Sequence, residues 1–304
     1  MPARVGRSVA AGVSAWPARA GRIGARVGGH ARMKRIQNLE MHAWHGCNLA
    51  CESCSHFSSL NLRGGPSAAD CRAWMAAWRD RLEPVVFSVL GGEPAMNREF
   101  VEIVEAAVEC WPRSHIRVVT NGFYLHRHPR LPEVMKRAAR STLEVNSHHA
   151  SEPFQRRFAP VRELVGQWQQ TYGLHVRLIE ASRKWSRRYE ADDEAIRFYD
   201  SDARTAWTAC VGKYCTQLHD GRLWKCAPAA YFEMVAGTRR TADSARALFR
   251  GYEPLGPSAG DAELDAFFAR EEESICRLCP ERLERFELPM PLGRRAVPIP
   301  QAAE

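Results

Sequence analysis

Three cysteines, Cys47, Cys51 and Cys54, stand within eight residues of one another in the stretch WHGCNLACESCSHF. A structural zinc site needs four ligands and a disulfide needs two. Three thiolates on a cluster of four irons and four sulfides leave one iron with an open position, which an amine and a carboxylate can fill together. The spacing therefore indicates an iron–sulfur centre with one free iron. A zinc site completed by His45 or His56 is the alternative.

The segment from residue 40 to about residue 182 alternates short apolar runs with helical patterns, which is typical of βα units and a parallel sheet. The run at 85–90 is apolar throughout, as expected for a strand buried on both faces. Ser67 and Asp70 form a capping box that predicts the start of the first helix. Strands are predicted at 40–44, 85–90, 116–120, 143–147 and 174–180, and helices at 67–82, 97–111, 132–139 and 161–172.

Four polar motifs follow predicted strands, at the ends where the loops of parallel β/α folds converge on one face. The cysteine triplet follows the first strand, GGEP the second and TNG the third, and NSHH closes the fourth. Together they predict a thiolate cluster, a glycine pair that permits close ligand approach and several polar groups around one cavity. The residues of the last three motifs are Gly91, Gly92, Glu93 and Pro94; Thr120, Asn121 and Gly122; and Asn146, Ser147, His148 and His149.

C-x3-C-x2-C after a first strand, with GGEP after the second, resembles the radical S-adenosylmethionine (SAM) superfamily over roughly residues 40–182. The resemblance implies a partial (β/α)6 TIM-like barrel in which the three cysteines hold a [4Fe-4S] cluster whose free iron binds SAM. It also implies that GGEP contacts the SAM amino group, and we expect Asn121, Asn146 and Ser147 to contribute to the same site. Many members carry an aromatic residue before the last cysteine, where this chain has Ser53.

The same resemblance implies a reaction. One electron from the reduced cluster, delivered by a donor such as flavodoxin or ferredoxin, cleaves SAM to methionine and a 5′-deoxyadenosyl radical. This radical takes a hydrogen atom from the substrate, and the barrel directs it and excludes water.

A second group of cysteines lies in the last third of the chain. Two of them flank a hairpin signal, Asp220-Gly221, and two form a C-x2-C. Four such thiolates can complete a zinc site or a fully ligated iron–sulfur cluster. The spacing resembles the twitch domain of certain radical SAM enzymes, which implies a second, auxiliary [4Fe-4S] cluster. The predicted ligands are Cys210, Cys226, Cys276 and Cys279, with Cys215 as a core thiol or an alternative to Cys210.

A fully ligated second cluster has no open iron, so electron transfer is its expected task. The leading hypothesis is a two-electron oxidation of a small carbohydrate-like metabolite; a peptide-modifying enzyme, a sugar epimerase or dehydratase, and a non-catalytic metal-binding protein are the alternatives. The basic-aromatic segment at 183–189 is a candidate site for a phosphate or carboxylate, although a solvated loop is the favoured interpretation. Candidate bases near strand ends are His148, His149, Arg177 and Glu180.

Composition limits the partners and the compartment. Residues 1–39 contain seven Arg, one Lys and no acidic residue, so the remaining chain has 35 basic and 35 acidic residues and offers little support for nucleic-acid binding. Ten cysteines without an export signal or a run of 18 apolar residues predict a cytoplasmic protein with no membrane span. The predicted fold is α/β: a basic, disordered extension at 1–38, a partial barrel at 39–205, a small α+β auxiliary-cluster domain at 206–287 and a Pro-rich tail at 288–304.

Overall fold

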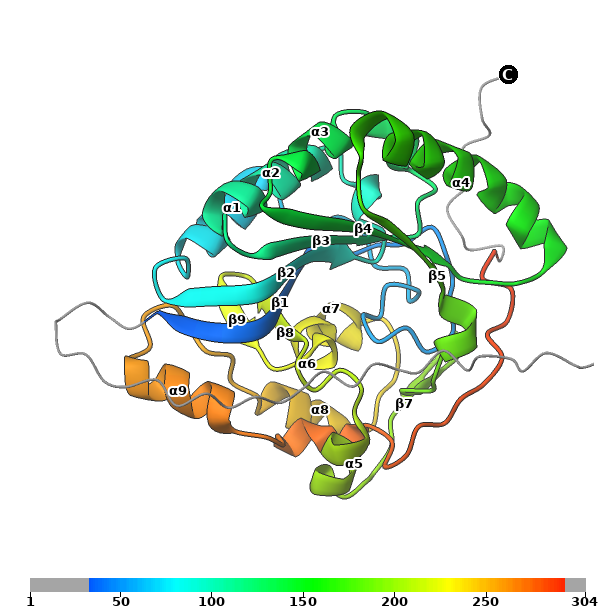
Figure 1. Cartoon of the computed structure of the whole chain (residues 1–304). Coiled ribbons are helices and arrows are strands. Elements are labelled where there is room, and N and C mark those ends of the chain that lie inside the picture. Colours follow the sequence, from blue (N-terminus) through cyan, green and yellow to red (C-terminus); the bar gives the residue numbers. More distant parts are fainter. Residues whose placement is uncertain (1–32, 293–304) are drawn as a thin grey trace, which may run out of the picture. The chain divides into compact units, whose positions relative to one another are not determined.

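The computed structural model describes residues 33–292, which contain a seven-stranded sheet of order β5-β4-β3-β2-β1-β8-β9 (Figure 1). Strands β1 to β5 are parallel to one another, and β8 pairs in parallel with β1. Strand β9 pairs antiparallel with β8. This confirms the α/β class with a mostly parallel sheet. The strands are β1 (Lys34–Trp44), β2 (Leu82–Gly91), β3 (His115–Thr120), β4 (Arg140–Ser147), β5 (Val176–Glu180), β8 (Thr216–His219) and β9 (Arg222–Trp224).

Four helices connect the successive parallel strands and cover one face of the sheet (Figure 1). They are α1 (Ala68–Ala76), α2 (Phe100–Cys110), α3 (Leu131–Lys136) and α4 (Glu152–Tyr172). Apolar side chains such as Met41, Phe87 and Val118 are fully buried in the core that these elements share. After β5 come a short hairpin of β6 (Glu190–Ala191) and β7 (Ile196–Arg197), and the helices α5 (Ala203–Ala209), α6 (Ala227–Tyr231), α7 (Glu233–Ala236), α8 (Asp243–Arg250) and α9 (Asp261–Ala269).

The position of the sixth parallel strand differs from the prediction. A (β/α)6 barrel places its sixth strand beside the fifth, but here β8 pairs with the free edge of β1, with Leu39 opposite Thr216. The hairpin predicted at Asp220-Gly221 is present, because both residues adopt positive φ, +49° and +70°. Strands β8 and β9, predicted within the second domain, therefore extend the sheet of the first.

Several predicted boundaries also shift. The capping box of Ser67 is confirmed, whereas α2 begins at Phe100, three residues after Asn97, whose Oδ1 accepts from Glu99 N–H at 2.9 Å. β1 begins at Lys34, inside the predicted extension, and α4 begins nine residues before 161. Residues 1–32 of the predicted extension and 293–304 of the predicted tail lie outside the described residues.

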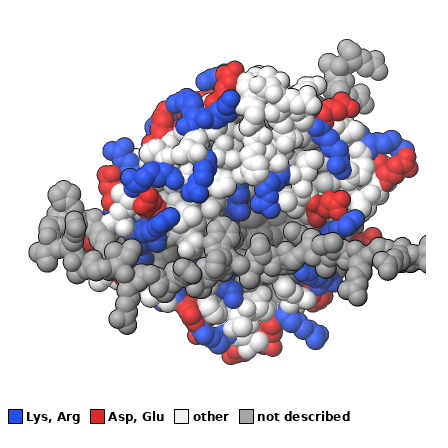
Figure 2. Space-filling view, viewed as in Figure 1, with Lys and Arg blue, Asp and Glu red and all other residues white. Residues whose placement is uncertain are grey.

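The described surface mixes charges of both signs. Basic and acidic side chains are interspersed over the face shown in Figure 2. No helix among residues 33–292 has both the length and the apolar character needed to cross a lipid bilayer.

The contact between Trp78 and the β8–β9 hairpin gives a stability prediction. The Trp78 side chain is fully buried, and its Nε1–H donates to Gly221 O at 2.8 Å. Trp78→Ala leaves a cavity and is expected to lower the free energy of unfolding by about 3–5 kcal/mol in a urea titration. Trp78→Phe keeps most of the ring volume and is expected to cost about half as much or less, with the hydrogen bond contributing about 1 kcal/mol. Equal stability of wild type and Trp78→Ala would contradict this packing.

Candidate functional site

The three cysteines of the first group line one cavity of about 220 Å³. Their loop follows β1, and the other walls come from the ends of β2, β3 and β4 and from the segment after β5. The structure thus brings together the motifs that the sequence placed at strand ends. The lining includes Cys47, Cys51, Cys54, Gly91, Gly92, Thr120, Asn121, Asn146, His148 and Trp185.

The two glycines of GGEP are required by the chain's own backbone. A Cβ at Gly91 would lie 2.1 Å from Trp44 O, and one at Gly92 would lie 2.2 Å from Gly46 O. Gly92 N–H donates to Trp44 O at 2.9 Å, and Glu93 N–H donates to Gly46 O at 2.8 Å. The two glycines therefore allow the cysteine loop to pack closely against this segment. Both glycines also line the cavity in which a ligand is predicted to bind.

Glu93 lies behind the cavity wall and is fully buried. Its carboxyl group accepts from Thr120 Oγ1 at 2.5 Å, Asn121 N at 2.7 Å and Ala95 N at 3.0 Å. Burial raises the pKa of Glu93 to about 7, although these hydrogen bonds act in the opposite direction. Of the residues predicted to bind the cofactor, Glu93, Pro94 and Ser147 lie outside the cavity lining.

In the first cavity Cys51 is buried, and Cys47 and Cys54 are half-buried. Burial raises the pKa of Cys47, Cys51 and Cys54, and the neighbouring thiols raise that of Cys51 further. Leu49 N–H and Asn121 Nδ2 face Cys47 Sγ at 3.4 and 3.6 Å, and they favour the thiolate. Because metals bind the thiolate, occupation of this site must release protons. Three sulfur donors from one loop fit the iron–sulfur cluster predicted there.

His148 is the candidate base that lines the first cavity. Its Nδ1 lies 3.4 Å from Cys51 Sγ, and its ring meets that of Trp185 edge-on at 5.7 Å between centroids. Burial lowers the pKa of His148 to about 4, so its imidazole is neutral at physiological pH.

The other three candidate bases lie outside this cavity. His149 Nδ1 accepts from Ser151 N–H at 3.1 Å, at the start of α4. Arg177 pairs with Glu144 at 3.4 Å, and Glu180 pairs with Arg183 at 2.7 Å. The side chains of Arg177 and Glu180 are largely exposed. The structure therefore separates these residues from His148, with which the sequence grouped them.

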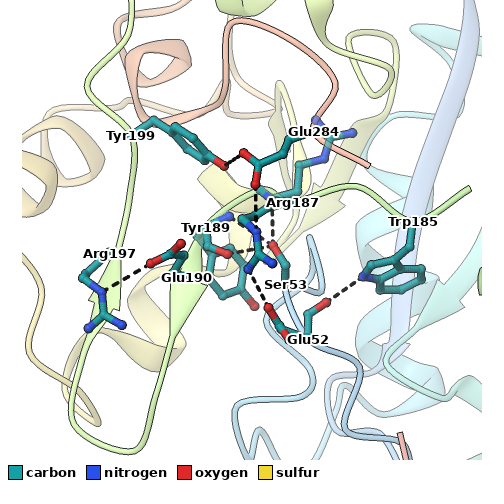
Figure 3. A network of polar contacts seen from close by, with 10 residues as sticks. Glu52, Ser53, Trp185, Arg187, Tyr189, Glu190, Arg197, Tyr199 and Glu284 are labelled. Carbon is teal, nitrogen blue, oxygen red and sulfur yellow. Dashed lines mark hydrogen bonds and ion pairs between the residues drawn. The ribbon is translucent and has the colours of Figure 1, made fainter. Parts of the chain in front are cut away.

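The segment 185–189 lies in the basic-aromatic stretch that the sequence named as a candidate anion site, and the structure places it against the cysteine loop. Trp185 Nε1–H donates to Glu52 O at 2.6 Å, Arg187 pairs with the Glu52 carboxylate at 2.5 Å, and Tyr189 is 2% exposed (Figure 3). The favoured interpretation as a solvated loop is therefore wrong, because these side chains pack on the cysteine loop. The alternation of aromatic and basic residues was the available signal, and it did not reveal the partner.

A second cavity of about 60 Å³ gathers the downstream cysteines. Burial raises the pKa of Cys279 to about 12, and the nearby Cys210 thiol adds to this effect. Cys215 does not line this cavity, and the pKa of its thiol is raised by burial and then by Glu40. The cysteines in the lining are Cys210, Cys226, Cys276 and Cys279, which are the four predicted as ligands.

Within residues 33–292, no three His, Cys, Asp or Glu side chains are arranged so that they could hold one metal ion.

Residues 41–184, just under half of the chain, are similar to the Radical SAM superfamily. No curated protein sequence matches the chain significantly.

The chain is distantly similar to several solved structures. SuiB from Streptococcus suis bound to S-adenosylmethionine is 17% identical, with a TM-score of 0.38, and the match covers 47% of this chain and 33% of SuiB. BtrN in an open conformation is 14% identical, with a TM-score of 0.41 over 81% of this chain and 92% of BtrN. BtrN in complex with AdoMet and 2-DOIA is 19% identical, with a TM-score of 0.38 over 50% and 59% of the two chains. The chain thus spans about a third of SuiB.

The raised pKa of Glu93 gives a pH prediction. The folded state holds this proton more tightly than the unfolded chain, so its stabilising effect is complete below about pH 4.5 and is lost as the pH rises through about 7. Glu93→Gln does not titrate there. Relative to this variant, the wild type is expected to lose roughly 3 kcal/mol of unfolding free energy between pH 4.5 and pH 8, at about 1.4 kcal/mol per pKa unit. Urea titrations of the metal-free proteins across this range measure the difference, and a constant difference would show an ordinary carboxyl pKa.

Proposed function

We propose that this chain is a radical SAM enzyme that oxidises a small, hydroxylated metabolite by two electrons, converting a secondary alcohol to a ketone. The observation that carries the proposal is the presence of two sulfur-lined cavities, one with three cysteines and one with four. The cofactors, when bound, supply a carbon radical able to take a hydrogen atom from an unactivated C–H bond. A one-electron donor such as a flavodoxin or ferredoxin belongs to the proposal.

The walls of the first cavity suit a neutral polar ligand. Asn146 contributes an amide, Ser58 a hydroxyl and Trp185 an indole surface. Thr120 and Asn121 also line the cavity, but their side chains already bond to other residues of the chain. Amide and hydroxyl groups can donate and accept hydrogen bonds with the hydroxyls of a sugar-like molecule, and an aromatic face can pack on its C–H surface. The lining supports a hydroxylated metabolite as substrate.

The second cavity supplies the reason to propose oxidation. Four thiolates occupy every outer position of a [4Fe-4S] cluster, so such a cluster can exchange electrons without binding substrate. A secondary alcohol that loses a hydrogen atom, a proton and one further electron becomes a ketone. A cofactor held by the first cysteine set would supply the acceptor of the hydrogen atom, the proton would leave to a base or water, and a cluster held by the second set would supply the acceptor of the electron.

The reaction of SAM tests the first half of the proposal. After anaerobic reconstitution with iron and sulfide, the wild type with dithionite and SAM is expected to form 5′-deoxyadenosine, detected by chromatography and mass spectrometry. Cys51→Ala, which leaves the cluster a ligand short, is expected to reduce formation at least about 100-fold, as for other metal-site losses. Cys110→Ala removes a half-buried thiol on α2 and is the matched control. Failure of the wild type to form the product would refute the radical SAM assignment.

Iron counting tests the second half. The wild type is expected to bind about eight irons, and the double variant Cys276→Ala/Cys279→Ala about four, because each cubane contains four. The double variant is expected to retain formation of 5′-deoxyadenosine, since its first cavity is intact. About four irons together with bound zinc in the wild type would show that the second site holds zinc and would remove the proposed electron acceptor.

A further inference from the structure

Segment 185–189 contacts both cysteine cavities. Trp185 lines the first cavity, whereas Arg188 and Tyr189 line the second. Five consecutive residues therefore supply a wall to each site. Any interaction that fixes this short segment fixes part of both walls at once.

Ser53 makes such an interaction through one hydroxyl group. Its Oγ accepts from Arg188 N–H at 2.6 Å and Tyr189 N–H at 3.1 Å, and it donates to Tyr189 O at 2.8 Å (Figure 3). These three bonds use its one proton and both lone pairs. Ser53 is 5% exposed, so removing the hydroxyl would leave buried backbone groups without this partner.

The backbone of Ser53 has an unusual conformation at this contact. Its φ is +57°, in the left-handed region that is unfavourable for residues other than glycine. A left-handed conformation at a buried, fully hydrogen-bonded residue indicates that surrounding contacts hold it there.

The residues on either side of Ser53 hold the same segment. Glu52 O accepts from Trp185 Nε1–H at 2.6 Å, and Cys54 O accepts from Tyr189 OH at 2.9 Å. Cys54 belongs to the first cysteine set, while Tyr189 is also part of the second cavity wall. The backbone of Cys54 and the wall of the second cavity are therefore set by the same contacts.

We propose that Ser53 is a positioning residue for both cysteine sites. Its hydroxyl holds segment 185–189 against the cysteine loop, and the segment in turn holds the Cys54 backbone and a wall of the second cavity. This inference rests on the proposed roles of the two cysteine sets and does not depend on the reaction that they support.

Site-resolved thiol labelling of the metal-free full chain tests the proposal. Under anaerobic, chelating conditions, Ser53→Ala is expected to raise the N-ethylmaleimide labelling rates of Cys54 and Cys279 together, each by about tenfold, the usual consequence of losing a buried hydrogen-bond partner. Mass spectrometry of digested peptides gives the rate for each cysteine. Cys71 is fully buried in the main core and serves as the internal reporter; its unchanged rate shows that the variant remains folded.

Ser114→Ala is the matched control. Ser114 is also a buried serine, and its hydroxyl donates to Pro84 O at 2.5 Å, next to the start of β3 and away from the cysteine loop. This variant is expected to leave the labelling of both cysteine sets unchanged. Acceleration of both sets by Ser114→Ala to the level of Ser53→Ala would overturn the proposal, because it would indicate a general loss of stability.

Ser53→Gly separates the hydroxyl from the backbone. Glycine relieves the left-handed strain but has no hydroxyl, so it is expected to accelerate labelling as alanine does. Wild-type rates in Ser53→Gly, or acceleration of Cys54 without Cys279 in Ser53→Ala, would overturn the proposal.

A spectroscopic readout follows after reconstitution with iron and sulfide. Ser53→Ala is expected to alter the low-temperature EPR signals of both reduced clusters, while Ser114→Ala leaves them as in the wild type. Unchanged signals from either cluster in Ser53→Ala would contradict a positioning role. Because labelling is measured without metal, failure to form 5′-deoxyadenosine would refute the proposed function and leave this inference standing.

Discussion

A buried glutamate connects the ends of three neighbouring strands through its carboxyl group and its backbone N–H, and the first cavity depends on it. Glu93 follows β2, its carboxyl accepts from Thr120 and Asn121 at the end of β3, and its N–H bonds to Gly46 in the loop after β1. Asn121 is thereby placed with its amide 3.6 Å from Cys47 Sγ. The GGEP segment thus holds the cysteine loop against the ends of β2 and β3.

The cysteine loop is also held by a segment that is distant from it in the chain. Trp185 and Tyr189 reach the cysteine loop from about 135 residues downstream, and the same part of the chain borders the cavity of the second cysteine set. The two groups of thiols are therefore connected through a short stretch of protein. Ser53, which stands where an aromatic residue is common in the resembled family, makes the contacts that join them.

The sequence was sufficient for the parallel strands β1 to β5 and for the cysteines around each cavity, because apolar runs mark buried strands and the cysteines stand in small groups along the chain. It did not place β8, since a four-residue strand carries little periodicity and its pairing with β1 joins positions about 175 residues apart. Nor did it show that Glu93 points behind the cavity wall, because a motif gives a residue's place in the chain and leaves its side-chain direction to packing. The basic-aromatic pattern at 183–189 likewise did not show that Trp185 packs on the cysteine loop, because such a pattern does not identify the buried surface that it contacts.

EPR spectroscopy of the reconstituted, dithionite-reduced chain with and without SAM tests the central claim most directly. If the three-cysteine site holds a cluster with an open iron and the four-cysteine site a fully ligated one, SAM will change one signal and leave the other as it was. The SAM-sensitive signal will be absent from Cys51→Ala, and the insensitive signal will be absent from Cys276→Ala/Cys279→Ala. A spectrum that SAM does not change would contradict the account.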